Sequence, residues 1–262
     1  MDFLHTLSWG YVASGFLVGS LVGLTGVGGG SLMTPILILL FGVQPLVAVG
    51  TDLLYAAATK TAGTFFHGFN HTIDWRVVRR LATGSIPAAL ITLLALHSLG
   101  ISSGAANMLV SKVLGGALLA TSSALIFRRQ LLAYYRKRVG PLDERRTRQF
   151  TIATGAVLGV LVTSSSVGAG ALGVTALILL YPEIPIARLV GSDIAHAVPL
   201  TLVSGLGHLF FGNINIQLLG TLLIGSLPGI FFGSALASRV PDRLLRYILA
   251  SVLLLVAARL LT

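Results

Sequence analysis

The chain has 262 residues, of which 55% are hydrophobic and only 10% are charged. Soluble domains carry about 25% charged residues, so this composition excludes a water-soluble protein and predicts an all-α polytopic membrane protein. The net charge of +10 would suit nucleic acid as a partner, but the basic residues gather between apolar runs, which is typical of cytoplasmic loops. We therefore expect the lipid bilayer, and no nucleic acid, as a partner.

Ten apolar segments follow one another along the chain, in two sets of five. Two of them, 31–42 and 168–181, are too short for a bilayer core of ~30 Å, and each follows a Gly- or Ser-rich break. Such pairs predict a discontinuous or re-entrant helix near 27–31 and near 164–170. The predicted segments are 10–29, 31–42, 46–69, 77–98, 104–127, 150–166, 168–181, 186–211, 216–237 and 243–261.

Internal repetition relates the two sets, at an offset of 140 residues that becomes 141 after one insertion. We therefore divide the chain into an N-terminal repeat (1–127), a basic loop (128–149) and a C-terminal repeat (150–262). The matched positions include Gly19 and Gly159, Pro45 and Pro185, Asp52 and Asp193, His67 and His208, and the Gly-Ser-X-Pro blocks at 84–87 and 225–228.

The basic turns occupy opposite positions in the two repeats. The turn at 74–80 is basic whereas its counterpart, 211–217, is uncharged; the turn at 97–104 lacks Lys and Arg whereas 238–246 is basic. Because Lys and Arg concentrate in cytoplasmic loops, the repeats are predicted to be inverted. We expect the loop 128–149 in the cytoplasm and both termini outside.

The residues from Gly19 to Pro35, Gly-x3-Gly-Leu-x-Gly-Val-Gly-Gly-Gly-Ser-Leu-x-x-Pro, resemble the opening motif of the TauE/SafE sulfite-exporter family. The Pro-x4-Gly-Thr-Asp run from Pro45 to Asp52 and the stretch from His67 to Trp75 resemble its next blocks. The resemblance implies a carrier of the cell inner membrane for small sulfur-containing anions, such as sulfite or organosulfonates. The second repeat departs from the motif at Ser164–Gly170, so the two halves are expected to contribute different chemistry.

The two breaks are candidate solute-binding segments. Glycine interrupts a helix and leaves backbone N–H groups that need a partner inside lipid, and a helix that begins there directs its N–H groups at an anion. Close helix packing through small residues is the alternative. The candidate residues are Gly28, Gly29, Gly30 and Ser31 in the first break, and Ser164, Ser165, Ser166, Gly168 and Gly170 in the second.

Ionisable residues inside apolar runs are the other candidates, because a charge in the membrane is costly. Lys60 occurs in the first repeat alone and suits an anion contact, with pairing to Asp52 as the alternative. The equivalent residues Asp52 and Asp193 suit proton or cation coupling, with N-terminal capping or structural bracing as the alternative. His196 follows Asp193 at i+3 and suits a proton relay, or is a core histidine with satisfied hydrogen bonds.

These residues predict a secondary transporter that exports a small sulfur-containing anion by alternating access. An anion channel, and less so an intramembrane hydrolase that uses Ser164–Ser166 with His196 or His208, stay as alternatives, and a homo-oligomer stays open. We expect no catalytic residues, since no nucleophile motif surrounds the serines. The sequence has no Cys and predicts neither a metal nor a cofactor.

Overall fold

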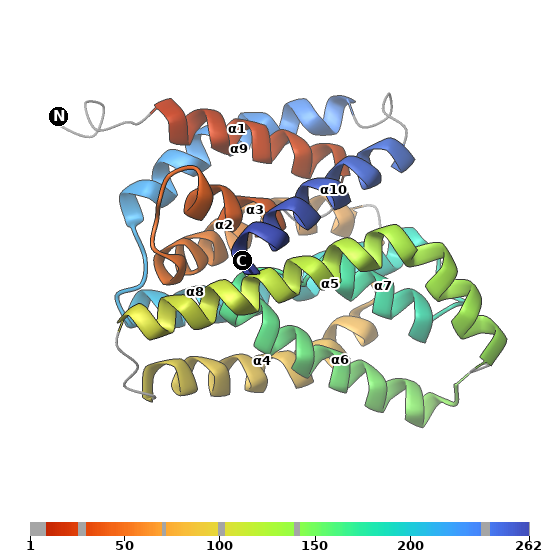
Figure 1. Ribbon diagram of the computed structural model, residues 1–262. Coiled ribbons are helices and arrows are strands. Elements are labelled where there is room, and N and C mark those ends of the chain that lie inside the picture. Colours follow the sequence, from red (N-terminus) through yellow and green to blue (C-terminus); the bar gives the residue numbers. More distant parts are fainter. Residues whose placement is uncertain are drawn as a thin grey trace.

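The computed structural model describes residues 9–25, 30–69, 72–98, 103–138, 142–236 and 242–261, and within these ranges every element is an α-helix (Figure 1). The helices are α1 (Trp9–Thr25), α2 (Gly30–Leu39), α3 (Pro45–Phe69), α4 (Trp75–Ser98), α5 (Ser103–Arg138), α6 (Glu144–Ser165), α7 (Ala171–Leu180), α8 (Ile186–Phe210), α9 (Ile216–Leu236) and α10 (Asp242–Leu261).

The ten predicted segments correspond to the ten helices, and most ends agree within three residues. The largest difference concerns the predicted loop 128–149, because α5 continues to Arg138 and α6 begins at Glu144. The stretch 128–138 consists mainly of Arg, Lys, Gln, Leu and Ala, which are strong helix formers. Asp143 then caps α6, since its side chain accepts from the backbone N–H of Arg146 at 2.7 Å.

Each short helix folds back along the helix that precedes it. The rings of Tyr11 at the start of α1 and Phe41 after α2 lie 4.5 Å apart. In the second half, the hydroxyl groups of Thr151 in α6 and Tyr181 after α7 are 2.8 Å apart. A ten-residue helix is about 15 Å long, or half the thickness of a bilayer core. The pairs α1–α2 and α6–α7 are therefore hairpins, which we call the first and second hairpin.

Both hairpins are held by close backbone contact with a neighbouring helix. Helix α1 runs beside α9, and α6 runs beside α4, with glycines of one helix against the backbone of the other. Small residues at such crossings allow the close approach on which helix association in lipid depends. The contacting positions are Gly15 with Leu222, Gly19 with Ser226, Gly155 with Leu81, and Gly159 with Ser85.

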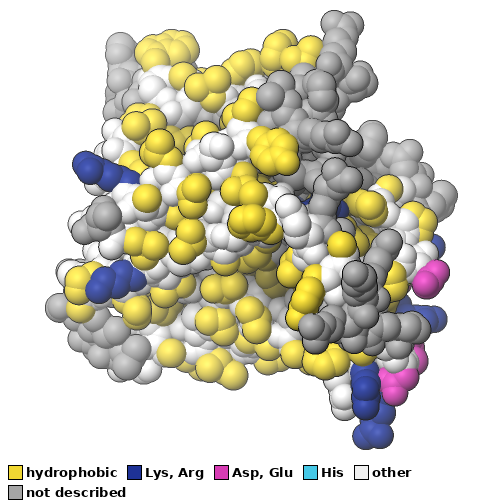
Figure 2. Space-filling view, turned by 45° about the vertical axis from the view of Figure 1, so that its right-hand side comes forward, with side chains coloured by type: hydrophobic (Ala, Val, Ile, Leu, Met, Phe, Trp, Pro, Cys, Tyr) yellow, Lys and Arg dark blue, Asp and Glu magenta, His cyan; other side chains and the backbone are white. Residues whose placement is uncertain are grey.

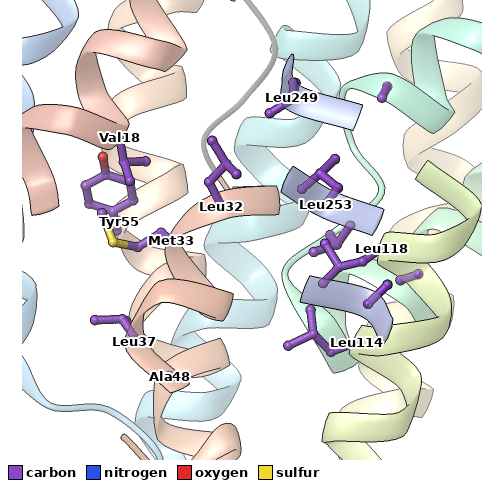
Figure 3. Close-up of a cluster of buried hydrophobic side chains, with 14 of the residues drawn as sticks. Val18, Leu32, Met33, Leu37, Ala48, Tyr55, Leu114, Leu118, Leu249 and Leu253 are labelled. Atoms are coloured by element: carbon purple, nitrogen blue, oxygen red, sulfur yellow. The ribbon is translucent and has the colours of Figure 1, made fainter. Parts of the chain in front are cut away.

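Helices α3 and α8 pass between the hairpins in antiparallel directions. Leu54 packs on Gly205, and Gly50 lies against the Cβ of His208. On either side of them, apolar side chains fill the interior. Figure 3 shows one such cluster, in which Met33 and Leu37 of α2 lie near Tyr55 of α3, and Leu114 of α5 lies near Leu253 of α10.

The outer surface of the molecule is hydrophobic over most of the face in Figure 2, with a group of charged side chains at its lower right edge. Four helical stretches in the described ranges are long and apolar enough to cross a membrane: Trp75–Ser98, Gly104–Arg128, Ile186–Phe210 and Ile216–Gly233. The window in α8 is 67% buried inside the protein, the largest share of the four, which places α8 near the centre of the bundle.

The contact between α4 and α6 leads to a first prediction. A Cβ at Gly84 would collide with the carbonyl oxygen of Ile152, so we expect Gly84→Ala to force the two helices apart. Overpacking of this kind costs about 1–3 kcal/mol. The apparent melting temperature of the purified protein in detergent should fall.

Gly116→Ala is the matched control, because Gly116 lies in α5 and nothing lies within 4 Å of the added Cβ. This change should leave the melting temperature equal or raise it, since Ala favours a helix over Gly by up to ~1 kcal/mol. Equal melting temperatures for the two variants would contradict the close packing of α4 on α6.

Candidate functional site

The tip of the second hairpin is a turn of irregular backbone buried in the protein. Helix α6 ends at Ser165, and Ser166 is left-handed with φ of 59°, its N–H donating to the Val162 carbonyl oxygen at 2.7 Å. Gly168 and Gly170 have φ of 127° and 122°, a region that side chains with a Cβ rarely adopt. The glycines predicted here are therefore required by the turn itself.

Lys60 of α3 reaches this tip. Its side chain is 7% exposed, and its ammonium donates to the carbonyl oxygen of Ala169 at 3.5 Å. Of the carboxylates around it, Asp193 has the stronger Coulombic interaction and Asp52 the weaker. The predicted pairing with Asp52 is thus only part of its environment, and Lys60 lies between charges contributed by both halves of the chain.

Asp52 joins α3 to the first hairpin. Its Oδ2 accepts the backbone N–H of Thr34 in α2 at 3.2 Å and the hydroxyl of Thr34 at 2.5 Å. Its Oδ1 is buried and has no hydrogen-bond partner among the described residues, although Ser166 lies nearby. Asp52 does not cap its own helix, because α3 begins at Pro45, two turns earlier. The contact with Thr34 fits the other alternative, structural bracing.

Asp193 holds the equivalent place in α8, beside the second hairpin. Its carboxylate packs directly against Gly173 in the first turn of α7 and faces the backbone of Gly170. Within the described ranges, neither carboxylate oxygen has a partner at good hydrogen-bond geometry. Because Thr34 has no counterpart at Asp193, the two carboxylates differ: Asp52 is braced by α2, whereas Asp193 is available at the hairpin tip.

His196 is buried and contacts helix α4. Its Nε2 lies 2.8 Å from the hydroxyl of Ser85 in α4, while its Nδ1 is buried without a partner in the described part of the chain. The contact of Nε2 is the one expected of a core histidine, whereas Nδ1 has no hydrogen-bond partner among the described residues. Tyr55, at the equivalent position of α3, lies beside Ser226 in the same way.

The predicted serines have separate environments. The hydroxyls of Ser164 and Ser165 donate to carbonyl oxygens of α6, those of Val160 and Leu161, each at 2.6 Å. Their contribution is to end the helix, and Ser165 also accepts the N–H of Val167. Ser166 differs, because its hydroxyl is buried and has no partner at hydrogen-bond geometry among the described residues.

The first break lies largely outside the described residues. This applies to Gly28 and Gly29, and to the side chain of Ser31. Gly30 is the first residue of α2, so the helix begins where the sequence predicts it. The structure therefore brings Lys60, Asp52, Asp193, Ser166 and the second hairpin together.

The histidines do not form a nucleophile–base pair with the serines. The Nε2 of His196 contacts Ser85, and the Nε2 of His208 lies 3.0 Å from the backbone oxygen of Thr163. Both Ser164 and Ser165 are committed to their own helix. Across the described ranges, no three His, Asp or Glu side chains gather to hold a metal ion. The arrangement suits binding of a charged solute.

Comparison with known proteins identifies the family. The family model described as Sulfite exporter TauE/SafE matches residues 11–260. The chain belongs to this family. The match covers both hairpins and all four charged or histidine residues predicted for the site, and with the apolar helices it makes the chain a multi-pass membrane protein.

Relatives of the chain are described as probable membrane transporter proteins. The chain is 38% identical to the probable membrane transporter protein YjnA of Bacillus subtilis, over 95% of this chain and 97% of the relative. It is 27% identical to a probable membrane transporter protein of Xylella fastidiosa strain 9a5c, over 87% and 84%. It is 26% identical to MJ0441 of Methanocaldococcus jannaschii, over 91% and 90%. No solved structure gives a significant match.

Two residues of the site have no signal in the sequence, since Thr34 is one hydroxyl in an apolar helix and Gly173 is one of 31 glycines. Thr34 meets Asp52 across the turn between successive helices. Ser85 belongs to the repeated Gly-Ser-X-Pro block, but the sequence does not reveal its contact with His196, 111 residues away. The cost of a buried charge in lipid therefore predicts Asp52, but it does not predict Thr34, which donates to it.

The contact between Thr34 and Asp52 leads to a second prediction. We expect Thr34→Val to leave Asp52 short of a donor in a buried place, at a cost of about 1–3 kcal/mol. The loss should be smaller in an Asp52→Asn background, since coupled residues are not additive. Apparent melting temperatures of the four proteins measure the coupling.

Thr59→Val is the control for this cycle. Thr59 is buried in α3, and its hydroxyl donates to carbonyl oxygens of its own helix, those of Tyr55 and Ala56. The fall in melting temperature caused by Thr59→Val should be the same with Asp or Asn at position 52. If Thr34→Val is equally independent of position 52, the two side chains are not coupled.

Proposed function

We propose that this protein is a secondary transporter that exports a small sulfur-containing anion, such as sulfite or an organosulfonate. The observation that carries the proposal is the buried ammonium of Lys60 at the tip of the second hairpin, beside Ala169. An ionisable side chain buried inside a membrane protein is a functional candidate by default. Membership of a family described as sulfite exporters supports an anion as its partner.

The anion would lie between Lys60 and the hairpin tip. Lys60 supplies the positive charge, the free hydroxyl of Ser166 can donate a hydrogen bond, and the N-terminus of α7 begins next to both. Gly170 precedes that helix with no side chain that caps it. From the first hairpin we assign Gly28, Gly29, Gly30 and Ser31 to the same site, by analogy with the second.

Coupling to a proton or another cation follows from charge balance. When Asp52, Lys60 and Asp193 are all ionised, the two carboxylates outweigh the single ammonium, and an anion would enter a site of its own sign. Protonation of a carboxylate, or a bound cation, removes this repulsion. We assign the exchanging group to Asp193, because Thr34 braces Asp52, and a relay role to the open nitrogen of His196.

The transport cycle rests on two inverted repeats, 1–127 and 150–262, with the segment 128–149 in the cytoplasm and both termini outside. Equivalent contacts support the repeat. The hydroxyl of Thr51 accepts the N–H of Asn215, and that of Ser192 accepts the N–H of Asp74. Glycine contacts repeat in the same way. Gly15 and Gly19 of α1 lie against α9, and their counterparts Gly155 and Gly159 of α6 lie against α4.

In this arrangement the first hairpin enters from outside and the second from the cytoplasm of the cell inner membrane. The tip of the second hairpin lies beside α3 and α8, where the charges lie, and we assign the first hairpin to the same site. Alternating access then needs each hairpin, with its partner helix α9 or α4, to move against α3 and α8 in turn. Both tips border one solute site, so opening one side can close the other.

Replacing Lys60 tests the anion contact. Lys60→Met keeps the length of the side chain and removes the charge, so sulfite or sulfonate efflux from proteoliposomes should fall to background. The control is Lys112→Met on α5, where the lysine is exposed and far from the motifs, and full flux is expected. Unchanged flux in folded Lys60→Met protein would show that Lys60 does not contact the transported anion.

Replacing the carboxylates tests the coupling. In Asp193→Asn protein, flux should no longer respond to a pH gradient imposed on the vesicles, whereas Asp52→Asn should lower the flux chiefly through stability. Asp74→Asn, outside the site and paired with Arg188, should keep the dependence. A pH-gradient response that persists in Asp193→Asn would refute the assignment of coupling to this residue.

A further inference from the structure

A groove lies on the second hairpin, away from the charged site. Its volume is about 600 Å³, and it runs between the first half of α6 and the second half of α7. The residues that define it are Arg146, Gln149, Phe150 and Thr154 of α6, and Ala176 and Leu179 of α7. None of them touches the site around Lys60, so the groove needs an occupant of its own.

The groove is polar at one end and apolar along the rest. Arg146 and Gln149 lie near the start of α6, whereas Phe150, Ala176 and Leu179 continue into the apolar body of the hairpin. Phe150 is 52% exposed, so an apolar wall faces the surroundings of the protein. A molecule that fits must have a polar head and a long apolar tail.

The length of the groove matches one leaflet. From Glu144, where helix α6 begins, to Thr154 the helix rises roughly 15 Å at 1.5 Å per residue, and half of a bilayer core is ~15 Å. A single acyl chain that lies along α6 would therefore extend from the membrane surface to its middle. An extended chain of this length fits the groove better than a compact solute does.

The charge near the polar end favours an anionic head. Of the acidic neighbours, Asp143 is used to cap α6, and Glu144 pairs with Arg80, whose guanidinium keeps the pKa of Glu144 below its usual range. Arg146 has no ion-pair partner in the described ranges, and Arg145 and Arg148 lie beside it.

We propose that this groove binds one anionic phospholipid, with its phosphate at Arg146 and Gln149 and one acyl chain between Phe150 and Leu179. The lipid would cover the outer face of α7, a ten-residue helix that is too short to span the membrane and that carries Gly173 of the solute site. It would hold the second hairpin against the cytoplasmic leaflet. This site is independent of which solute the protein carries.

The test uses the purified full-length protein and native mass spectrometry. Phosphatidylglycerol and phosphatidylcholine with the same acyl chains are titrated in turn. The wild type should retain one phosphatidylglycerol in preference to phosphatidylcholine. Arg146→Gln should weaken the first binding event roughly fivefold, the effect expected for one basic side chain at an anionic surface. Ala176→Phe should fill the groove and abolish the preference.

Arg145→Gln is the matched control, because it removes the same charge from the same turn without lining the groove. It should weaken binding by less than about twofold. Equal weakening by Arg145→Gln and Arg146→Gln would overturn the proposal in favour of a diffuse basic surface. Equal binding of the two lipids by the wild type would also overturn it. If Ala176→Phe does not fold, the proposal is decided by comparing the phosphatidylglycerol binding of Arg146→Gln with that of Arg145→Gln.

Discussion

In the interior of a bilayer, a charge is stable only where opposite charge, hydrogen bonds or trapped water compensate it. Lys60, Asp52 and Asp193 meet this requirement together, although each alone would be costly. The ammonium interacts electrostatically with both carboxylates, and the irregular backbone of the second hairpin provides the Ala169 carbonyl. The hairpin itself depends on the same principle, since backbone that leaves the helical pattern at this depth must be enclosed by protein.

The rest of the architecture keeps that enclosure intact. Close glycine contacts bind α1 to α9 and α6 to α4, and α3 and α8 carry the charges between the two pairs. Because Gly173 lies directly against Asp193, even a methyl group at this point would displace the carboxylate. Packing and solute chemistry thus meet in the same turn of α7, and a hairpin that moves would change the environment of both carboxylates.

Much of the fold could be predicted because apolar length and helix-breaking residues are local properties. The ends of α3, at Pro45 and Phe69, and the short α2 and α7 follow from them. The extension of α5 to Arg138 was missed because a helix can continue into water when its residues favour it. Of the site, the charges could be predicted from their cost in lipid. The contacts of Thr34, Ser85 and Gly173 could not, because they depend on how the helices pack on one another.

The central claim is that the charged group at the tip of the second hairpin binds the transported anion. An experimental structure with selenite, a heavier analogue of sulfite, tests this most directly through the anomalous signal of selenium. We predict a peak whose oxygens lie within about 4 Å of the Lys60 ammonium, the range of an ion pair, on the side of Ser166. A peak elsewhere in the protein, with none at Lys60, would contradict the account.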